Sequence, residues 1–362
     1  MTRWLALAAS GGLSLPLSLA LAAPGAPPAT APTPAELAGL LARFDVPGVA
    51  VATLKACEPV AEPVVAGRAT LAPDRPVTPA TVFEAASLSK PVFAWLVMQL
   101  ADEKLIDLDR PLAETFDYAR IPDKAAYAKL TPRLVLTHRT GLPNWVGGDV
   151  EFPQRTAPIP FKHPPGTANS YSGEAFQLLQ AFVEHTTGRS LQALFQARLG
   201  HVMPQSTFVR PLRPGTVASR GYASAAQASG GRDMTTLTDH ALSAASLVTT
   251  AQDYARFLSL VCRREGLSRA AYDDLLRPQA PVPGDEPPGP MSRGLGWAIT
   301  RLVDGTTLVS HNGSNGEYRA FAGFVRDSRD GIVILTNGVR GRALIEALLE
   351  LPPAPAAGAS AP

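Results

Sequence analysis

Apolar runs with the character of β-strands lie near both ends of the chain. Residues 48–54 are small and β-branched, and a similar run at residues 64–66 follows after a turn, which predicts a hairpin. Four more such runs follow one another late in the chain and predict a β-meander. They are residues 295–300, 307–310, 318–325 and 332–336.

Helices with recognisable caps occupy much of the remaining sequence. Thr33 and Glu36 form the pattern of a capping box at the start of a helix. Thr250 is a good N-cap for a helix over residues 251–264, which we expect Gly266 to close. Further helices are predicted for residues 87–104, 131–137, 174–185, 190–199 and 343–351.

Strands at both ends with helices between them predict an α+β (two-lobe α/β) fold. One antiparallel β-sheet is built from both ends of the chain, is flanked by terminal helices and receives a large helical lobe as an insertion. The predicted domain spans residues 33–351. Its sheet lobe comprises residues 33–80 and 291–351, and its helical lobe comprises residues 81–290.

The two ends of the sequence have compositions that do not suit a packed fold. Residues 1–22 combine Arg3, an apolar run and the motif Ala-Leu-Ala, which is typical of a cleaved signal peptide. Residues 23–32 are predicted to be an Ala/Pro-rich linker and residues 352–362 a disordered tail. We therefore expect a bacterial protein that is periplasmic or secreted, with no stable membrane span once the signal is removed.

Composition narrows the classes of function. Hydrophobic residues make up 46% of the chain and charged residues 18%, which indicates a globular protein with a sizeable core. The net charge of +2 does not favour nucleic-acid binding, and the histidines lack metal-ligand spacing, so we expect neither a metal nor another cofactor. For Cys57 and Cys262 two buried free thiols are the default expectation, with a disulfide as the alternative that export permits.

The chemistry-bearing stretch with the clearest pattern is Ser87 with Lys90, at the start of an apolar helix. Residues three apart share a helix face, so the hydroxyl and the amine would lie about one turn apart. A buried lysine with a lowered pKa can take the proton of a serine nucleophile. The alternative is that Ser87 is an N-cap and Lys90 extends to solvent.

Two other short motifs suit a catalytic site without demanding one. Tyr171 stands in a polar turn, residues 165–173, that leads into a helix, where a phenol can donate or carry a proton. His311, Asn312 and Gly313 lie between predicted strands, where Gly313 would allow close approach of substrate and His311 would offer a donor or partial positive charge. Taken singly, each motif is also compatible with a structural role.

In this order the three motifs resemble the serine β-lactamase and penicillin-binding protein (D,D-peptidase) superfamily, in particular its class C-like serine hydrolase branch. S-x-x-K is a signature of these enzymes. The resemblance covers residues 46–337. It is supported by the stretches at residues 78–84, 105–112, 131–143 and 294–297.

The resemblance implies a role for each motif. Ser87 would be acylated, Lys90 would take or relay its proton, and Tyr171 would be the second acid/base partner, with the identity of the general base left open. The backbone N–H of Ser87 and a strand N–H just after Gly313 would form the oxyanion hole. His311, Asn312, Gly313 and Gly173 would contact substrate. The Thr137–His138 pair is expected to be a structural turn.

Two departures from the family pattern bear on substrate choice. Gly173 stands where the family often has an asparagine, and His311 replaces a lysine that would be a permanent cation. These changes favour an esterase or D-amino-acid peptidase over a dedicated β-lactamase. We expect an exported, monomeric serine hydrolase acting on a small-molecule or peptide substrate that is an ester, a D-amino-acid peptide or a β-lactam. The alternatives are a true class C-like β-lactamase and a catalytically weak penicillin- or cell-wall-binding protein.

Overall fold

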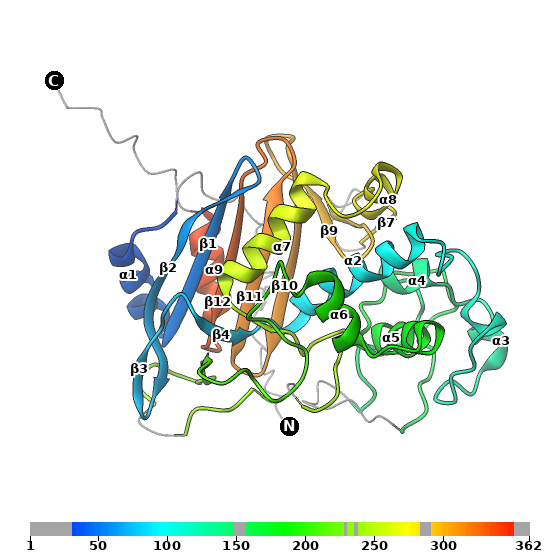
Figure 1. Cartoon of the computed structure of the whole chain (residues 1–362), viewed down its shortest axis with the longest axis horizontal. Helices are drawn as coiled ribbons and strands as arrows, with labels where there is room; N and C mark the ends of the chain where they lie inside the picture. Colours follow the sequence, from blue (N-terminus) through cyan, green and yellow to red (C-terminus); the bar gives the residue numbers. More distant parts are fainter. Residues whose placement is uncertain (1–30, 148–155, 228–229, 235–237, 283–290, 351–362) are drawn as a thin grey trace, which may run out of the picture.

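The computed structural model describes residues 31–147, 156–227, 230–234, 238–282 and 291–350 (Figure 1). The predicted signal peptide, all but the last two residues of the predicted linker, and the predicted tail lie outside the described residues. None of the helices within these ranges is long and apolar enough to cross a membrane.

A nine-stranded antiparallel sheet contains strands from both ends of the chain, in the order β3-β2-β1-β12-β11-β10-β9-β8-β7. β1 pairs directly with β12, so that Val49 lies opposite Thr336. The predicted fold class is therefore confirmed. The strands are β1 (Gly48–Lys55), β2 (Glu58–Leu71), β3 (Asp74–Pro76), β7 (Ala280–Pro281), β8 (Met291–Arg293), β9 (Ala298–Arg301), β10 (Thr307–Asn315), β11 (Tyr318–Val325) and β12 (Gly331–Thr336).

The two faces of the sheet are covered by different helices. The terminal helices α1 (Pro34–Phe44) and α9 (Gly341–Glu350) lie on one face, and α7 (Ala251–Arg263) lies across the other (Figure 1). Alternate residues of β1 lie in different apolar clusters, which explains why both faces of this strand are apolar. Val49 and Val51 join the cluster that contains the α1 and α9 side chains, whereas Ala50 and Ala52 face the main core. Successive strand residues point to opposite faces, so a sheet covered on both sides needs an unbroken apolar strand.

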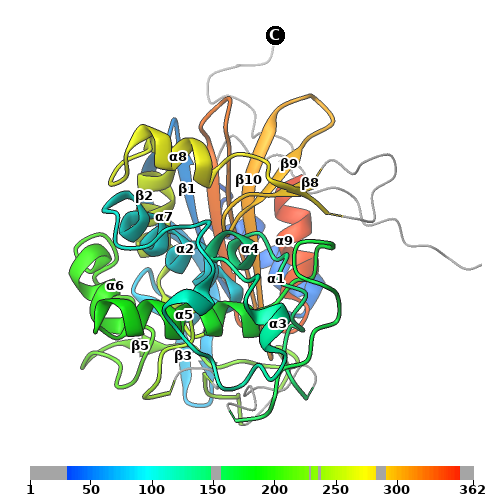
Figure 2. The ribbon, with the colours of Figure 1, turned by 90° about the vertical axis from the view of Figure 1, so that its right-hand side faces the viewer.

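The remaining helices gather on the α7 side of the sheet and beyond its β7 edge, as Figure 2 shows. They surround α2, whose side chains are almost all buried. β7 pairs with β8 although it falls within the predicted helical lobe. These helices are α2 (Ser89–Asp102), α3 (Lys124–Tyr127), α4 (Pro132–Leu136), α5 (Gly173–Thr187), α6 (Leu191–Leu199) and α8 (Arg269–Leu275), with 3₁₀ turns η1 (Ala86–Leu88) and η2 (Leu112–Glu114). A small second sheet has the order β5 (Val217–Ala218), β4 (Thr81–Glu84), β6 (Val248–Thr249).

The predicted helix caps are largely confirmed. Thr33 and Glu36 make both hydrogen bonds of a capping box, and the Thr250 hydroxyl accepts the N–H of Asp253. The C-terminus of α7 differs from the prediction, because Arg264, with φ of 63°, adopts the left-handed conformation in place of Gly266. The backbone N–H of Arg264 caps Leu260 and Val261 carbonyls, so the helix ends two residues before the glycine.

Cys57 and Cys262 form a disulfide, with their Cα atoms 5.5 Å apart. The default expectation of two free thiols was therefore wrong. Cys57 lies in the turn between β1 and β2, and Cys262 lies in the last turn of α7, which packs across those strands. The bond joins segments 205 residues apart, a proximity that only the assembled fold creates.

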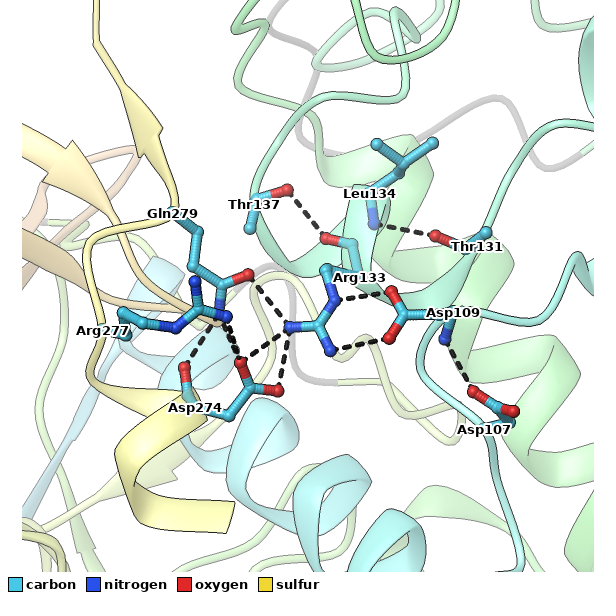
Figure 3. Close-up of polar contacts among 9 residues, drawn as sticks. All are labelled: Asp107, Asp109, Thr131, Arg133, Leu134, Thr137, Asp274, Arg277 and Gln279. Atoms are coloured by element: carbon cyan, nitrogen blue, oxygen red, sulfur yellow. Dashed lines mark hydrogen bonds and ion pairs between the residues drawn. The ribbon is translucent and has the colours of Figure 1, made fainter. Parts of the chain in front are cut away.

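Arg133 joins three segments of the chain through its guanidinium group (Figure 3). Its Nε and Nη2 donate to the two carboxylate oxygens of Asp109, at 2.6 and 2.8 Å. Its Nη1 donates to the Asp274 carboxylate at 2.8 Å and to Oε1 of Gln279 at 3.0 Å. α4 is thereby tied to the loop that follows α2, to α8 and to the connection from α8 into β7.

We expect Arg133→Ala to lower the free energy of unfolding by about 1–3 kcal/mol, because the partly buried Asp274 carboxylate and the exposed Asp109 carboxylate lose their charge-assisted partner. Urea denaturation measures this difference. Arg110→Ala is the matched control, because its ion pair with Glu114 is exposed and should contribute less than about 1 kcal/mol. Equal losses in the two variants would contradict a structural role for the Arg133 cluster.

Candidate active site

Ser87 lies in η1, at the point where β4 passes into α2. It is the one residue between Thr81 and Lys90 that is not buried. The preceding residue, Ala86, has φ of 52°, a conformation that costs an L-residue about 1–2 kcal/mol. Ser89 holds this turn, since its hydroxyl donates to the Ala86 carbonyl at 2.6 Å and accepts the N–H of Leu247 at 2.9 Å. The fold thus presents the Ser87 side chain on a fixed, strained turn.

Lys90 follows on the first turn of α2 and is only 1% exposed. Its Nζ donates to Ser87 Oγ at 3.2 Å and to the Ala244 carbonyl at 2.8 Å. Burial, with a smaller contribution from the Arg293 charge, lowers the pKa of the Lys90 amine to about 7. The alternative of a solvent-directed lysine is wrong, and the amine is partly neutral at neutral pH.

Tyr171 completes the group from the turn before α5. The Lys90 ammonium lies 4.6 Å from the centre of its ring. Burial raises the pKa of the Tyr171 phenol to about 12, and a hydrogen bond with the Ser87 side chain opposes the rise. Tyr171 is therefore a neutral phenol at physiological pH.

His138 lies in a turn, with φ of 55°, and its ring centre is 4.3 Å from that of Tyr171. Its Nδ1 accepts the backbone N–H of Ser172 at 3.1 Å, so the ring proton is on Nε2. Burial holds the pKa of His138 well below its usual value. The Thr137–His138 pair forms the expected turn, and a neutral His138 supports the ring of Tyr171.

His311 lies on β10, with its ring centre 6.2 Å from that of Tyr171. Burial, and then the charges of Lys90 and Arg293, lower the pKa of His311 to about 3. Its Nδ1 is 2.7 Å from the Asn312 carbonyl and must donate to it, which leaves Nε2 as an acceptor. The expected partial positive charge at His311 is thus absent at neutral pH.

Asn312 and Gly313, which follow His311 on β10, differ in their exposure to solvent. Asn312 is exposed, whereas the residues on either side of it are buried, because side chains alternate along a strand. A Cβ atom on Gly313 would lie 2.4 Å from the Ala85 carbonyl oxygen. Gly313 therefore lets β10 pack against the turn that carries Ser87. We had expected substrate to approach Gly313 closely, but it is the backbone of Ala85 that does so.

A family model described as Beta-lactamase matches residues 35–350. The chain belongs to the Beta-lactamase family. It is a serine hydrolase of the β-lactamase and penicillin-binding protein superfamily, as the sequence motifs predicted.

Solved structures of this superfamily share the fold. A penicillin-binding protein from Bacillus halodurans has a TM-score of 0.71 and 22% identity, over 86% of this chain and 98% of that one. The D-amino acid amidase from Ochrobactrum anthropi SV3 has a TM-score of 0.69 and 20% identity, over 86% and 98%. The octameric penicillin-binding protein homologue from Pyrococcus abyssi has a TM-score of 0.71 and 19% identity, over 86% and 75%.

The departure at Gly173 from the family pattern has a structural explanation. A Cβ atom at this position would lie 2.4 Å from the indole ring of Trp145, so the ring occupies the space that a larger side chain would need. The nearby Asn169 does not replace the missing amide, because its Nδ2 is directed to the Thr137 carbonyl at 3.4 Å. The indole ring of Trp145 thus occupies the space that the asparagine side chain of the family's motif would need. Sequence reasoning missed Trp145.

An ion pair that sequence reasoning also missed fixes the start of α5. The Glu174 carboxylate is fully buried and accepts from Arg120 Nη1 at 2.8 Å and Nη2 at 3.1 Å. It also accepts the N–H of Val146 at 3.1 Å. The Glu174 carboxylate thus ties the backbone next to Trp145 to the start of α5, the helix that follows the Tyr171 turn.

Arg293 is another residue near the site that sequence reasoning missed. It ends β8, and its guanidinium carbon lies 5.7 Å from the centre of the Tyr171 ring. The available signal was its position directly before Gly294-Leu-Gly-Trp, one of the stretches that carries the family resemblance. Within the described ranges, no group of three or more His, Cys, Asp or Glu side chains is arranged to hold a metal ion.

Proposed function

We propose that this protein is an exported serine hydrolase in which Ser87 forms an acyl-enzyme with an ester, a D-amino-acid peptide or a β-lactam. The observation that carries the proposal is the buried amine of Lys90, 3.2 Å from Ser87 Oγ and with a pKa lowered to about 7. A neutral amine at that distance can accept the serine proton in the transition state of attack.

The proposed reaction has two halves. In the first, Ser87 Oγ bonds to the substrate carbonyl carbon, its proton passes to Lys90, and the leaving group departs with a proton relayed through Tyr171. In the second, water gives a proton to the same pair and attacks the acyl carbon. The pair returns this proton to Ser87 Oγ as its bond to the acyl carbon breaks, and the carboxylic acid product leaves. The phenol form of Tyr171 suits the donor role, which favours Lys90 as the general base.

The developing oxyanion requires fixed donors. We assign the backbone N–H of Ser87 and a strand N–H just after Gly313 to this role. The packing of Gly313 against Ala85 supports it, because it fixes β10 beside the turn that carries Ser87. Loss of one such donor typically costs about 10²–10³ in rate, so the close packing here serves catalysis.

The similar structures keep the substrate classes open. They include a D-amino acid amidase, a D-alanine carboxypeptidase and a mutant of a class C β-lactamase. A class C-like β-lactamase activity is therefore the second candidate, and a catalytically weak penicillin- or cell-wall-binding protein is the third. The buried, partly neutral Lys90 favours an active enzyme over the third candidate.

The disulfide between Cys57 and Cys262 supports export, because such bonds persist in oxidising compartments. We propose a periplasmic or secreted enzyme that acts as a monomer. The octameric homologue from Pyrococcus abyssi provides the contrasting possibility. Sedimentation of the mature protein distinguishes the two states.

A substrate panel tests the proposed function. It comprises a chromogenic cephalosporin, a D-Ala-D-Ala peptide and short-chain p-nitrophenyl esters, with kcat/KM measured for each on wild type and Ser87→Ala. We expect at least one class to be turned over by wild type alone. Absence of turnover in every class, with stoichiometric penicillin binding, would favour the binding-protein alternative.

The pH dependence of turnover should follow Lys90. Above a pKa of about 7 the amine is neutral and can accept the serine proton, and below it the amine is protonated. For an uncharged p-nitrophenyl ester, kcat/KM should therefore rise about tenfold per pH unit below 7 and level off above it. His311 and Tyr171, with pKa values near 3 and 12, should add no limb between pH 5 and 9. A flat profile over this range would contradict Lys90 as the base.

A further inference from the structure

Arg293 carries a positive charge beside the candidate active site without a partner in the described part of the chain. Its Nε is buried and has no hydrogen-bond partner. No carboxylate is among the groups that influence its pKa, which burial lowers and Tyr171 alone raises. Arginine remains charged at physiological pH even so, because its ordinary pKa exceeds 12.

Leaving a buried charge unpaired normally costs several kcal/mol. Elsewhere in the described fold a buried arginine is matched, as Arg120 is by Glu174. An uncompensated charge beside groups with perturbed pKa values is a candidate functional group. The partner of Arg293 is then expected to arrive from outside.

The backbone around Arg293 is held tightly. Its carbonyl accepts the N–H of Gln279 at 2.8 Å, and its strand position pairs with Ala298 of β9. The next residue, Gly294, donates to the Trp297 carbonyl at 2.9 Å and has no room for a side chain, since a Cβ would lie 2.8 Å from the Leu275 carbonyl oxygen. The guanidinium group is thus presented from a rigid turn.

The position of the guanidinium group relates it directly to the proposed chemistry. Both basic side chains lie close to the Tyr171 ring, with Lys90 Nζ at 4.6 Å and Arg293 Cζ at 5.7 Å from its centre. Arg293 also lowers the pKa of Lys90, His138 and His311 through its charge. It is only partly exposed, which leaves access for a small ligand and excludes much of the water that would screen its charge.

We propose that Arg293 is the anion-binding residue of the active site and selects substrates that carry a carboxylate close to the scissile bond. This inference rests on the proposed function, which it deepens by naming the substrate class. The planar guanidinium group suits a carboxylate, with which it makes two parallel hydrogen bonds. D-amino-acid peptides with a free C-terminus and β-lactams carry such a group, whereas simple alkyl esters do not.

The other candidates for this role are less suitable. His311 is neutral at neutral pH and directs its only N–H to the Asn312 carbonyl. Lys90 must be neutral to accept the serine proton. Arg293 therefore supplies from β8 the permanent charge that the substitution of histidine for lysine removes from β10.

Two aryl esters test the proposal. One carries a carboxylate and the other a carboxamide at the meta position of the leaving phenol, so that they differ in charge and little in shape. We expect wild type to prefer the carboxylate ester at least tenfold in kcat/KM. Arg293→Gln should reduce this preference about 10–100-fold, the value of a charge-assisted hydrogen bond, and Arg293→Lys should retain part of it.

Arg301→Gln is the matched control, because it removes the same charge from an exposed position on the adjacent strand β9. It should leave the preference unchanged. Thermal denaturation of each variant separates loss of folding from loss of recognition. The same substrate preference in wild type and in a folded Arg293→Gln would overturn the proposal. Failure of wild type to hydrolyse either ester would instead contradict the proposed function.

Discussion

Ser87→Ala is expected to abolish turnover of every substrate, with a loss of at least about 10⁴ in kcat/KM, while the protein remains folded. No neighbouring group can replace the missing nucleophile, because Lys90 and Tyr171 are directed at the Ser87 oxygen itself. The folded state should persist because the turn is held by Ser89 and not by the Ser87 hydroxyl. Ester hydrolysis and the melting temperature measure the two effects.

Ser328→Ala provides a matched control, since this serine is exposed in the turn between β11 and β12. It should keep the wild-type rate. If Ser87→Ala hydrolysed a p-nitrophenyl ester as fast as wild type, the assignment of Ser87 would be wrong.

The second prediction concerns two substitutions in the proton-transfer pair, Lys90→Met and Tyr171→Phe. Each is expected to lower kcat/KM by about 10²–10⁴. Methionine retains the length and apolar packing of the buried lysine stem but cannot accept a proton. Phenylalanine retains the ring that lies against His138 but lacks the phenol hydroxyl. Both substitutions remove proton transfer and largely preserve shape.

The pH profile separates a proton-transfer role from a structural one. Lys90→Met should lose the rising limb near pH 7, whereas Tyr171→Phe should retain it at a lower rate. A limb that survives unchanged in a folded Lys90→Met would assign the titration near pH 7 to another group.

The elements that carry the site could be predicted because their signals are local. Spacing of three residues brings Ser87 and Lys90 onto one helix face, and a polar turn before a helix indicates the place of Tyr171. Strand runs at both ends of the chain predicted one sheet built from both ends, and the structure shows that β1 and β12 pair within it. The order of the three motifs along the chain supported the resemblance to the family.

The features that were missed depend on contacts between distant segments. The disulfide needs the β1–β2 turn to meet the end of α7, 205 residues away. Trp145 fills the space beside Gly173 only because Glu174 binds the backbone of Val146. An arginine at the end of a short strand has no sequence pattern that reveals whether a carboxylate pairs with it.

His311 illustrates how burial alters an expectation based on residue type. The sequence suggested a histidine that offers substrate a donor or a partial positive charge. Burial, with the charges of Lys90 and Arg293, instead keeps His311 neutral throughout the physiological range. The preference for a carboxylate, if Arg293 provides it, should therefore be constant between pH 5 and 9.

The central claim is that Ser87 becomes covalently acylated, and labelling with a fluorophosphonate, followed by peptide mass spectrometry, tests it most directly. Such a probe reacts with an activated serine and leaves a stable adduct. We predict one adduct per chain, on the peptide that contains Ser87, with no labelling of Ser87→Ala and slow labelling of Lys90→Met. An adduct on a different serine, or continued ester hydrolysis by fully labelled protein, would contradict the account.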